Sequence, residues 1–526
     1  MTNLFRYILL CATLIGAIHA SVAQVSQPRR YEVEQKFSDD AFSIIALEEE
    51  GLALFRETND FEKGDQLWEL IILDTALQEK SNTFLQQAAK NEFIGYDYQP
   101  GELSLLFRAG QTERSPLSLV VYELDSLSHD SFEIKLEISL RLTHFAQVGT
   151  SFAIGGYVTN EPAIVLFNSL DQSMSIVPGF FQKDMELVDV RSNKDHKTFN
   201  TVLIDRSNRD DRKLVFRTFD LKGNLLLEDV IDVDENKVLI NGIVSSLERE
   251  DLVIMGTWGP RNSKQAAGIY AVTIDPFEKQ SIQYYNFGQM EHVFDYMKPK
   301  RAKRIKAKIL EDVREGRNPA YTTYVMPFRI LEHSQGFVLL ADVYNPSSTY
   351  SRNYYSPYGS YPYYYDPYWG SFSYPRRIYN QPYGYGNNMM QDNDNIKTYE
   401  SFLVSLNSQG KLAWDHSFTL DDVRLPSIDQ TADFALVNDN VYFIYKKEKE
   451  LRVKQIPLSD DEPTEYTESI KLSSDLDELR SEREREGSVR YWFGDSFYVW
   501  GIQNIRNKTE VEKTRRVFYI NKLVAH

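Results

Sequence analysis

The mature part of this chain lacks cysteine. The one cysteine among the 526 residues, Cys11, lies inside an apolar N-terminal run. A lipoprotein signal would need that cysteine at the end of the run, whereas apolar residues also follow it. Without further cysteine the chain can form no disulfide and has no thiolate nucleophile, so its core alone must hold it together. No later stretch reaches about 18 uninterrupted apolar residues, which excludes a membrane-spanning helix after the leader.

The N-terminal residues 1–23 have the features of a secretory signal. Arg6 supplies the positive charge, and the apolar run from Tyr7 to Ile18 follows it. Small residues then stand in Ser21-Val22-Ala23, which predicts Gln24 as the first mature residue. We therefore expect an exported protein. We expect it in a periplasm rather than outside the cell, because no sorting domain is evident after the last predicted strand.

The chain also lacks the motifs of several enzyme classes. It contains no Gly-x-Ser-x-Gly nucleophile elbow and no glycine-rich phosphate loop. None of the mature histidines is paired at a metal-ligand spacing: they are His129, His144, His196, His292, His333, His416 and His526. We accordingly expect no catalytic residue, no metal and no cofactor, and favour a protein that is not an enzyme.

Basic residues are outnumbered. The 59 Lys and Arg stand against 76 Asp and Glu, a formal charge of −17. Nucleic acid is disfavoured as a partner because contacts to phosphates need a basic surface. Hydrophobic residues make up 42%, enough for a sizeable core, and 33 Tyr and 30 Phe favour half-buried strands.

What the chain has instead is a repeat of short apolar strands joined by polar turns. Four strands recur in each unit, and unit length is about 50 residues once insertions are set aside, which suits a four-stranded propeller blade. The predicted units span 42–85, 93–136, 142–177, 186–231, 239–287, 324–418, 433–472 and 489–523.

The two ends of the repeat complement each other. The eighth unit has three strands, and Arg30–Phe37 alternates like a strand without belonging to the first unit. The N-terminal strand would supply the missing one, and such closure removes exposed sheet edges. We predict an all-β fold, a monomeric β-propeller of eight four-stranded blades closed by the N-terminal strand. Seven blades, or a pair of β-sandwiches, are the alternatives.

The stretch Leu406-Asn407-Ser408-Gln409-Gly410-Lys411-Leu412-Ala413-Trp414 resembles the repeat of quinoprotein (PQQ)-like propellers, in which a strand, a polar turn with glycine and a tryptophan follow one another. The stretch Leu221-Lys222-Gly223-Asn224-Leu225-Leu226 is a similar copy without the tryptophan. The resemblance covers two units and implies the propeller fold. No quinone pocket can be assigned residue by residue, so it implies no cofactor.

Three insertions interrupt the repeat. Residues 298–319 hold seven basic residues between Lys298 and Lys308, and an apolar stripe of Ala302, Ile305, Ile309 and Val313 predicts a helix. Residues 344–398 form a tyrosine-rich loop, with fourteen tyrosines and six prolines between Tyr344 and Tyr385. Residues 473–487 carry a run of Asp, Glu and Arg that predicts a solvated helix.

The positions of the insertions predict that they share one face. Two of them join the fourth strand of a blade to the first strand of the next, and the tyrosine-rich loop joins a second strand to a third. In antiparallel blades these connections lie at the same end of the strands. We predict that this face binds a protein or a cell-envelope polymer. The candidate partner-binding residues are Tyr354, Tyr355, Tyr358, Tyr361, Tyr363, Tyr364, Tyr365, Tyr368, Trp369, Arg301, Lys303 and Arg304.

Each insertion can also be interpreted as a segment that has no binding function. The two helices could be solvated spacers, and the tyrosine-rich loop could be a low-complexity segment that binds nothing. The alternative for the whole protein is a propeller enzyme, glycan-active or quinone-dependent, with its site at the mouth of the central channel. A cluster of carboxylates and histidines with shifted pKa values at that mouth would favour this alternative.

Overall fold

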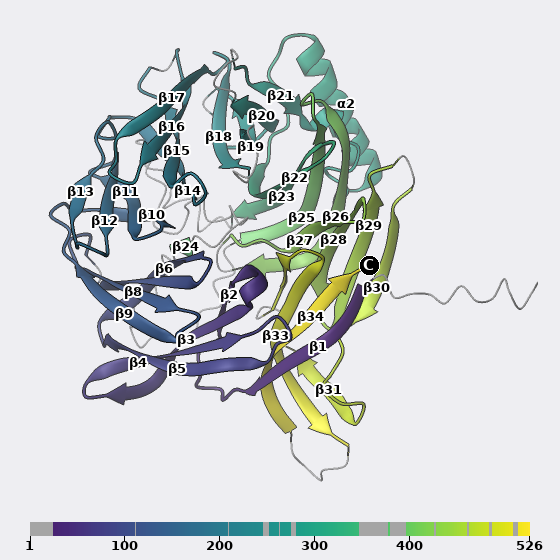
Figure 1. Ribbon diagram of the computed structural model, residues 1–526. Helices are drawn as coiled ribbons and strands as arrows, with labels where there is room; N and C mark the ends of the chain where they lie inside the picture. Colours follow the sequence, from purple (N-terminus) through teal and green to yellow (C-terminus); the bar gives the residue numbers. More distant parts are fainter. Residues whose placement is uncertain are drawn as a thin grey trace, which may run out of the picture. The chain divides into compact units, whose positions relative to one another are not determined.

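The computed structural model describes residues 25–110, 112–208, 210–245, 252–261, 263–274, 280–346, 377–378, 396–425, 428–459, 462–482, 487–508 and 514–526. Its strands form eight antiparallel sheets, each with a core of four strands (Figure 1). The fold is an eight-bladed all-β propeller, as predicted. Contacts divide the chain into two compact units, Phe37–Ala432 and a second one made of Met1–Lys36 with Asp433–His526.

The larger unit, Phe37–Ala432, contains blades 1 to 6, and the strands of each blade pair in chain order apart from an added strand in blade 2. Blade 1 is β2 (Ser43–Ala46), β3 (Leu52–Glu62), β4 (Asp65–Leu73) and β5 (Glu79–Ala88); blade 2 is β6 (Asn91–Gln99), β7 (Glu102–Ala109), β8 (Leu117–Glu123) and β9 (Ser128–Ile134); blade 3 is β10 (Arg141–Val148), β11 (Ser151–Val158), β12 (Glu161–Asn168) and β13 (Met174–Ile176). Blade 4 is β14 (Met185–Asn193), β15 (Thr198–Asp205), β16 (Lys213–Asp220) and β17 (Leu225–Asp232); blade 5 is β18 (Lys237–Val244), β19 (Leu252–Pro260), β20 (Gly268–Ile274) and β21 (Gln283–Asn286); blade 6 is β22 (Tyr324–His333), β23 (Gly336–Pro346), β25 (Ile396–Asn407) and β26 (Leu412–Leu425).

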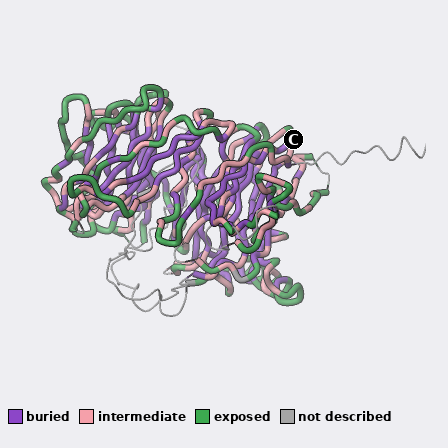
Figure 2. Tube along the Cα trace, turned by 90° about the horizontal axis from the view of Figure 1, so that it is seen from below, coloured by how far each residue is buried: buried purple, intermediate pink, exposed green. Residues whose placement is uncertain are grey.

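Four short elements lie between the described strands of this unit. They are the 3₁₀ turns η1 (Glu48–Glu50) and η2 (Phe287–Gln289), the helix α2 (Pro299–Arg314) and the two-residue strand β24 (Arg377–Ile378). The first strands of blades 2 to 6 contact one another in succession. Buried residues run along the strands, while the turns are largely exposed (Figure 2).

The smaller unit contains blades 7 and 8. Blade 7 is β27 (Ala432–Val437), β28 (Asn440–Lys447), β29 (Glu450–Pro457) and β30 (Thr464–Ser469); blade 8 combines β31 (Asp477–Glu482), β32 (Val489–Phe493), β33 (Ser496–Asn507) and β34 (Thr514–Ala525) with the N-terminal β1 (Val25–Glu34). Strand β1 pairs antiparallel with β34, from Val25 opposite Ala525 to Glu34 opposite Val517. The N-terminal strand thus supplies the outer strand of the last blade, as predicted, but it begins at Val25 and ends at Glu34 instead of covering Arg30–Phe37.

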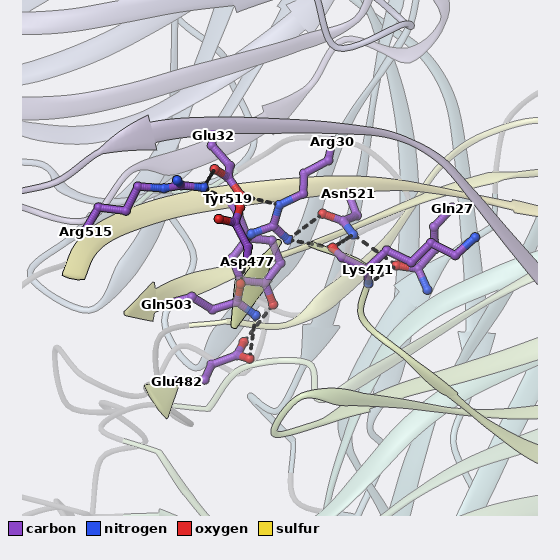
Figure 3. A network of polar contacts seen from close by, with 10 residues as sticks. All are labelled: Gln27, Arg30, Glu32, Lys471, Asp477, Glu482, Gln503, Arg515, Tyr519 and Asn521. Carbon is purple, nitrogen blue, oxygen red and sulfur yellow. Dashed lines mark hydrogen bonds and ion pairs between the residues drawn. The ribbon is translucent and has the colours of Figure 1, made fainter. Parts of the chain in front are cut away.

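A polar network fixes β1 in blade 8 (Figure 3). The Arg30 guanidinium, with 6% of its side chain exposed, donates to Glu32 at 2.6 Å, to Asn521 at 3.0 Å and to Gln503 at 2.9 Å. It also lies over the Tyr519 ring, 4.3 Å from the centroid. Such buried polar networks specify one arrangement when every group is satisfied.

The turns that carry the quinoprotein resemblance have one geometry. The Asn407 side chain accepts from the amides of Gln409 and Lys411, and Gly410 adopts φ +71°. The Asp220 carboxylate accepts from Lys222 and Asn224 in the same way, with Gly223 at φ +82°. Each is therefore an Asx turn closing a hairpin between the third and fourth strands.

The third insertion is not a helix. Its residues Asp477–Glu482 form β31, which pairs with the C-terminal half of β33. The prediction from the charge run was wrong, because β33 extends beyond β32 and its backbone groups need a partner there. The tyrosine-rich insertion is shorter than predicted, since β23 runs to Pro346 and β25 begins at Ile396.

Candidate binding face

The predicted basic helix is α2, between blades 5 and 6. Proline stands at its first position, where a missing amide costs nothing. Ala302 and Ile309 are buried, and Ile305 packs against the same core, which includes Phe287 and Phe294. Val313, the fourth residue of the predicted stripe, is 41% exposed. The stripe therefore docks the helix through its first three residues, while Val313 at its end is partly in solvent.

The segment before α2 is held by two carboxylates from blade 6. Asp415 of β26 accepts from the amides of Glu291 and His292 at 2.6 Å and of Val293 at 3.0 Å. Glu400 of β25 accepts from the next two amides, those of Phe294 at 2.8 Å and Asp295 at 2.9 Å. Five consecutive amides thus converge on two side chains. We call this arrangement the carboxylate clasp, and it fixes the chain that leads into α2.

Burial dominates the electrostatics of the clasp. It raises the pKa of Glu400 to about 8, although the two amide bonds oppose the shift. It also raises the pKa of Asp415, against three amide bonds. The hydrogen bond that His292 donates to the Asp295 carboxylate raises the pKa of His292, whose ring stacks on His416 with centroids 5.0 Å apart. These groups form the cluster of carboxylates and histidines that the enzyme alternative called for.

The enzyme alternative, however, required such a cluster at the mouth of the central channel. Glu400 and Asp415 lie on the third and fourth strands of blade 6, whereas the first strand of that blade is β22. Both carboxylates are also occupied by backbone amides. The clasp therefore has the features of a structural anchor.

The solvent side of α2 is basic. Arg301, Lys303 and Arg304, the three predicted contact residues described by the structure, are exposed, as are Lys298 and Lys300. Within the described part of the chain none of these five forms an ion pair, whereas Lys308 and Arg317 both bind Asp312, at 3.2 Å and 2.8 Å. We call Lys298, Lys300, Arg301, Lys303 and Arg304 the basic face.

Strand register places α2 and the tyrosine-rich insertion at the same end of blade 6. Tyr324, the first residue of β22, lies opposite Tyr344 near the end of β23. Pro346 lies opposite Ile396, so both ends of the insertion are there too. The third insertion belongs to the other compact unit, and its place on this face stays a prediction.

The aromatic candidates fall outside the described residues. They are Tyr354, Tyr355, Tyr358, Tyr361, Tyr363, Tyr364, Tyr365, Tyr368 and Trp369. Their role in binding stays a prediction.

Sequence reasoning missed the clasp. Glu400 and Asp415 occupy the side of β25 and β26 that also carries the buried Phe402 and Val404. A carboxylate at a core-facing position of an alternating strand is the available signal, since buried charges need partners. In the described residues no three His, Cys, Asp or Glu side chains gather as metal ligands, and no helix there is long and apolar enough to cross a membrane.

Comparison with known proteins finds similarity in solved structures only. No protein-family model matches the chain, and no curated protein matches its sequence. The propeller domain of the Trilobed protease from Pyrococcus furiosus is 8% identical over 81% of this chain and 95% of that chain, with a TM-score of 0.34. The Dos1 propeller is 10% identical over 83% and 92%, with a TM-score of 0.39. A prolyl endopeptidase is 8% identical with a TM-score of 0.40, and 90% of this chain matches 55% of that longer chain.

Proposed function

We propose that this protein is an exported, non-enzymatic β-propeller scaffold that binds an anionic protein or cell-envelope polymer through the face carrying α2 and the tyrosine-rich insertion. The basic face carries the proposal. Five basic side chains gather within seven residues of a chain whose formal charge is −17. Positive charge concentrated against the sign of the whole protein provides a local attraction for an anionic group.

The basic residues lie at the N-terminal end of α2, and this position supports the binding of an anion. No acidic residue stands in the first turn of α2. Cations near the positive end of a helix dipole are unfavourable by about 0.3–1 kcal/mol each at low ionic strength. A bound anion offsets that cost. Local arrangements that oppose folding are expected at functional sites.

The clasp gives the basic face a fixed position. Because the Glu400 and Asp415 carboxylates hold the five amides ahead of α2, and because Ile309 anchors the helix itself, binding needs little ordering of the backbone. Preorganisation of this kind strengthens binding by lowering its entropic cost.

Charge reversal tests the proposal. The variant Arg301→Glu/Lys303→Glu/Arg304→Glu should lose retention on an immobilised sulfated polysaccharide and on an immobilised poly-glutamate peptide, and wild-type retention should fall as salt rises. The matched control reverses Lys90, Lys135 and Lys183, which are exposed in other blades. Equal retention of the two triple variants would contradict the proposal. Retention on one matrix alone would identify the class of partner.

A further inference from the structure

The first strands of blades 2 to 6 share a bulge. In β6, β10, β14, β18 and β22 one residue is skipped in the pairing with the second strand. A bulge leaves an unpaired residue and re-aims the side chain that follows. The residues directly after the bulges are Gly95, His144, Asp189, Asn241 and Arg329.

Blade 2 differs from the others at this position. His144, Asp189, Asn241 and Arg329 place polar side chains there, and all four are at most 8% exposed. Gly95 has no side chain. Glycine in a strand often marks a place where another backbone approaches closely. The position after the bulge, which carries a polar side chain in these four blades, therefore carries none in β6.

A further strand lies on the edge of β6 away from β7. Arg377 pairs with Tyr96 and Ile378 with Gly95, antiparallel, so that β24 extends blade 2 beyond its first strand. Strand β24 also contacts β10. Among the first strands described in the other blades of this unit, each pairs with its second strand alone. The strand with glycine after its bulge is thus the one that accepts an additional strand.

We infer that the edge of β6 away from β7, at Gly95 and Tyr96, is a docking site for an extended peptide, and that its occupant is this chain's own segment at Arg377 and Ile378. Recognition by strand addition uses main-chain hydrogen bonds, so it needs an unobstructed edge more than particular side chains. Gly95 provides that edge. The site thereby ties the insertion of blade 6 to blade 2. This inference is independent of the basic face.

Proteolysis of the full chain tests the inference. Trypsin cleaves after Arg377, and pairing in a sheet protects that bond. The substitution Gly95→Val adds a side chain at the edge and should speed cleavage between Arg377 and Ile378 at least tenfold. An unchanged rate in a folded Gly95→Val protein would overturn the inference.

A second variant separates docking from folding. Pro346 and Ile396 lie opposite each other, so residues 347–395 can be replaced by a short Gly/Ser hairpin turn. In this shortened chain Gly95→Val should leave the melting temperature unchanged, because no strand remains for it to displace. A loss of stability equal to that in the full chain would show that valine damages the blade itself, and would overturn the assignment of Gly95 to docking.

The shortened chain also allows a binding measurement. A synthetic peptide of residues 371–382 should bind it, and should bind the shortened Gly95→Val chain at least tenfold more weakly. In an antiparallel ladder neighbouring residues alternate between donating to the partner strand and pointing away. N-methylation of Arg377 or of Ile378 should therefore abolish binding in one peptide and spare it in the other. No binding, or equal binding of both methylated peptides, would contradict strand addition.

Discussion

Lys446 of β28 donates to Glu482 of β31 across 2.8 Å, with 2% and 4% of the two side chains exposed. The same carboxylate accepts from Gln503 at 2.9 Å and from Tyr519 at 2.7 Å. Burial raises the pKa of Tyr519 further above its ordinary value, so the phenol stays a donor. Glu482 therefore joins strands from blades 7 and 8 within the smaller unit, and it belongs to the segment that the sequence pattern assigned to a solvated helix.

Replacing Lys446 by an apolar residue should lower the free energy of unfolding strongly. Lys446→Met leaves a buried carboxylate without its cation, and the expected loss is about 3–5 kcal/mol of unfolding free energy. The double variant Lys446→Met/Glu482→Gln should recover part of that loss, because the uncompensated charge is gone. Urea denaturation of the single and double variants checks this. A loss below about 1 kcal/mol for Lys446→Met would show that the pair contributes little.

Arg30 should contribute more to the stability of the protein than Arg29, its neighbour on β1. Arg30→Met leaves the buried side chains of Gln503 and Asn521 short of a donor, which should lower the unfolding free energy by about 2–4 kcal/mol. Arg29→Met is the control, since Arg29 is exposed on the same strand. Both are compared by chemical denaturation. Similar losses for the two variants would contradict a fixing role for the network in Figure 3.

The blades could be predicted because each rests on local signals. Alternating apolar residues and polar turns recur along the chain, and the unpaired strand at each end indicated how β1 completes blade 8. The segment Asp477–Glu482 could not be predicted in this way. Its strand conformation depends on the exposed edge of β33, and Asp477 gains the Arg515 guanidinium at 2.7 Å. Tertiary contacts overrode the local preference for a helix.

Stability should depend on pH through Glu400. Burial raises its folded-state pKa from 4.5 to about 8, so the folded state binds a proton more tightly than the unfolded state does. The stabilisation from this group is complete below pH 4.5 and is lost as pH rises through 8. Wild type should therefore lose about 2–4 kcal/mol relative to Glu400→Gln between pH 4.5 and 8.5. Denaturation of both proteins across this range checks the sign.

A parallel pH dependence in Glu400→Gln and wild type would show that other groups carry it. The groups facing Glu400 are Asp295, Ser417 and Tyr296, and the Asp295 charge helps to raise its pKa. Asp295→Asn is thus a useful companion variant, expected to lower the pKa of Glu400 and reduce the loss.

The site was predictable only in part. Arg301, Lys303 and Arg304 stand out in the sequence as a basic run, and the structure exposes them on α2. The clasp joins residues more than 100 positions apart, such as Phe294 and Glu400. No local pattern connects them, because the contact exists only once blade 6 has formed against the segment before α2.

The most direct measurement of the central claim is the salt dependence of binding to a sulfated polysaccharide, for wild type and for the Arg301→Glu/Lys303→Glu/Arg304→Glu variant, by calorimetry. The account predicts wild-type binding that weakens as salt rises, and a variant that binds at least tenfold more weakly at low salt. Identical affinities for wild type and this variant, beside an unchanged Lys90→Glu/Lys135→Glu/Lys183→Glu control, would contradict the claim that α2 forms the anion-binding face.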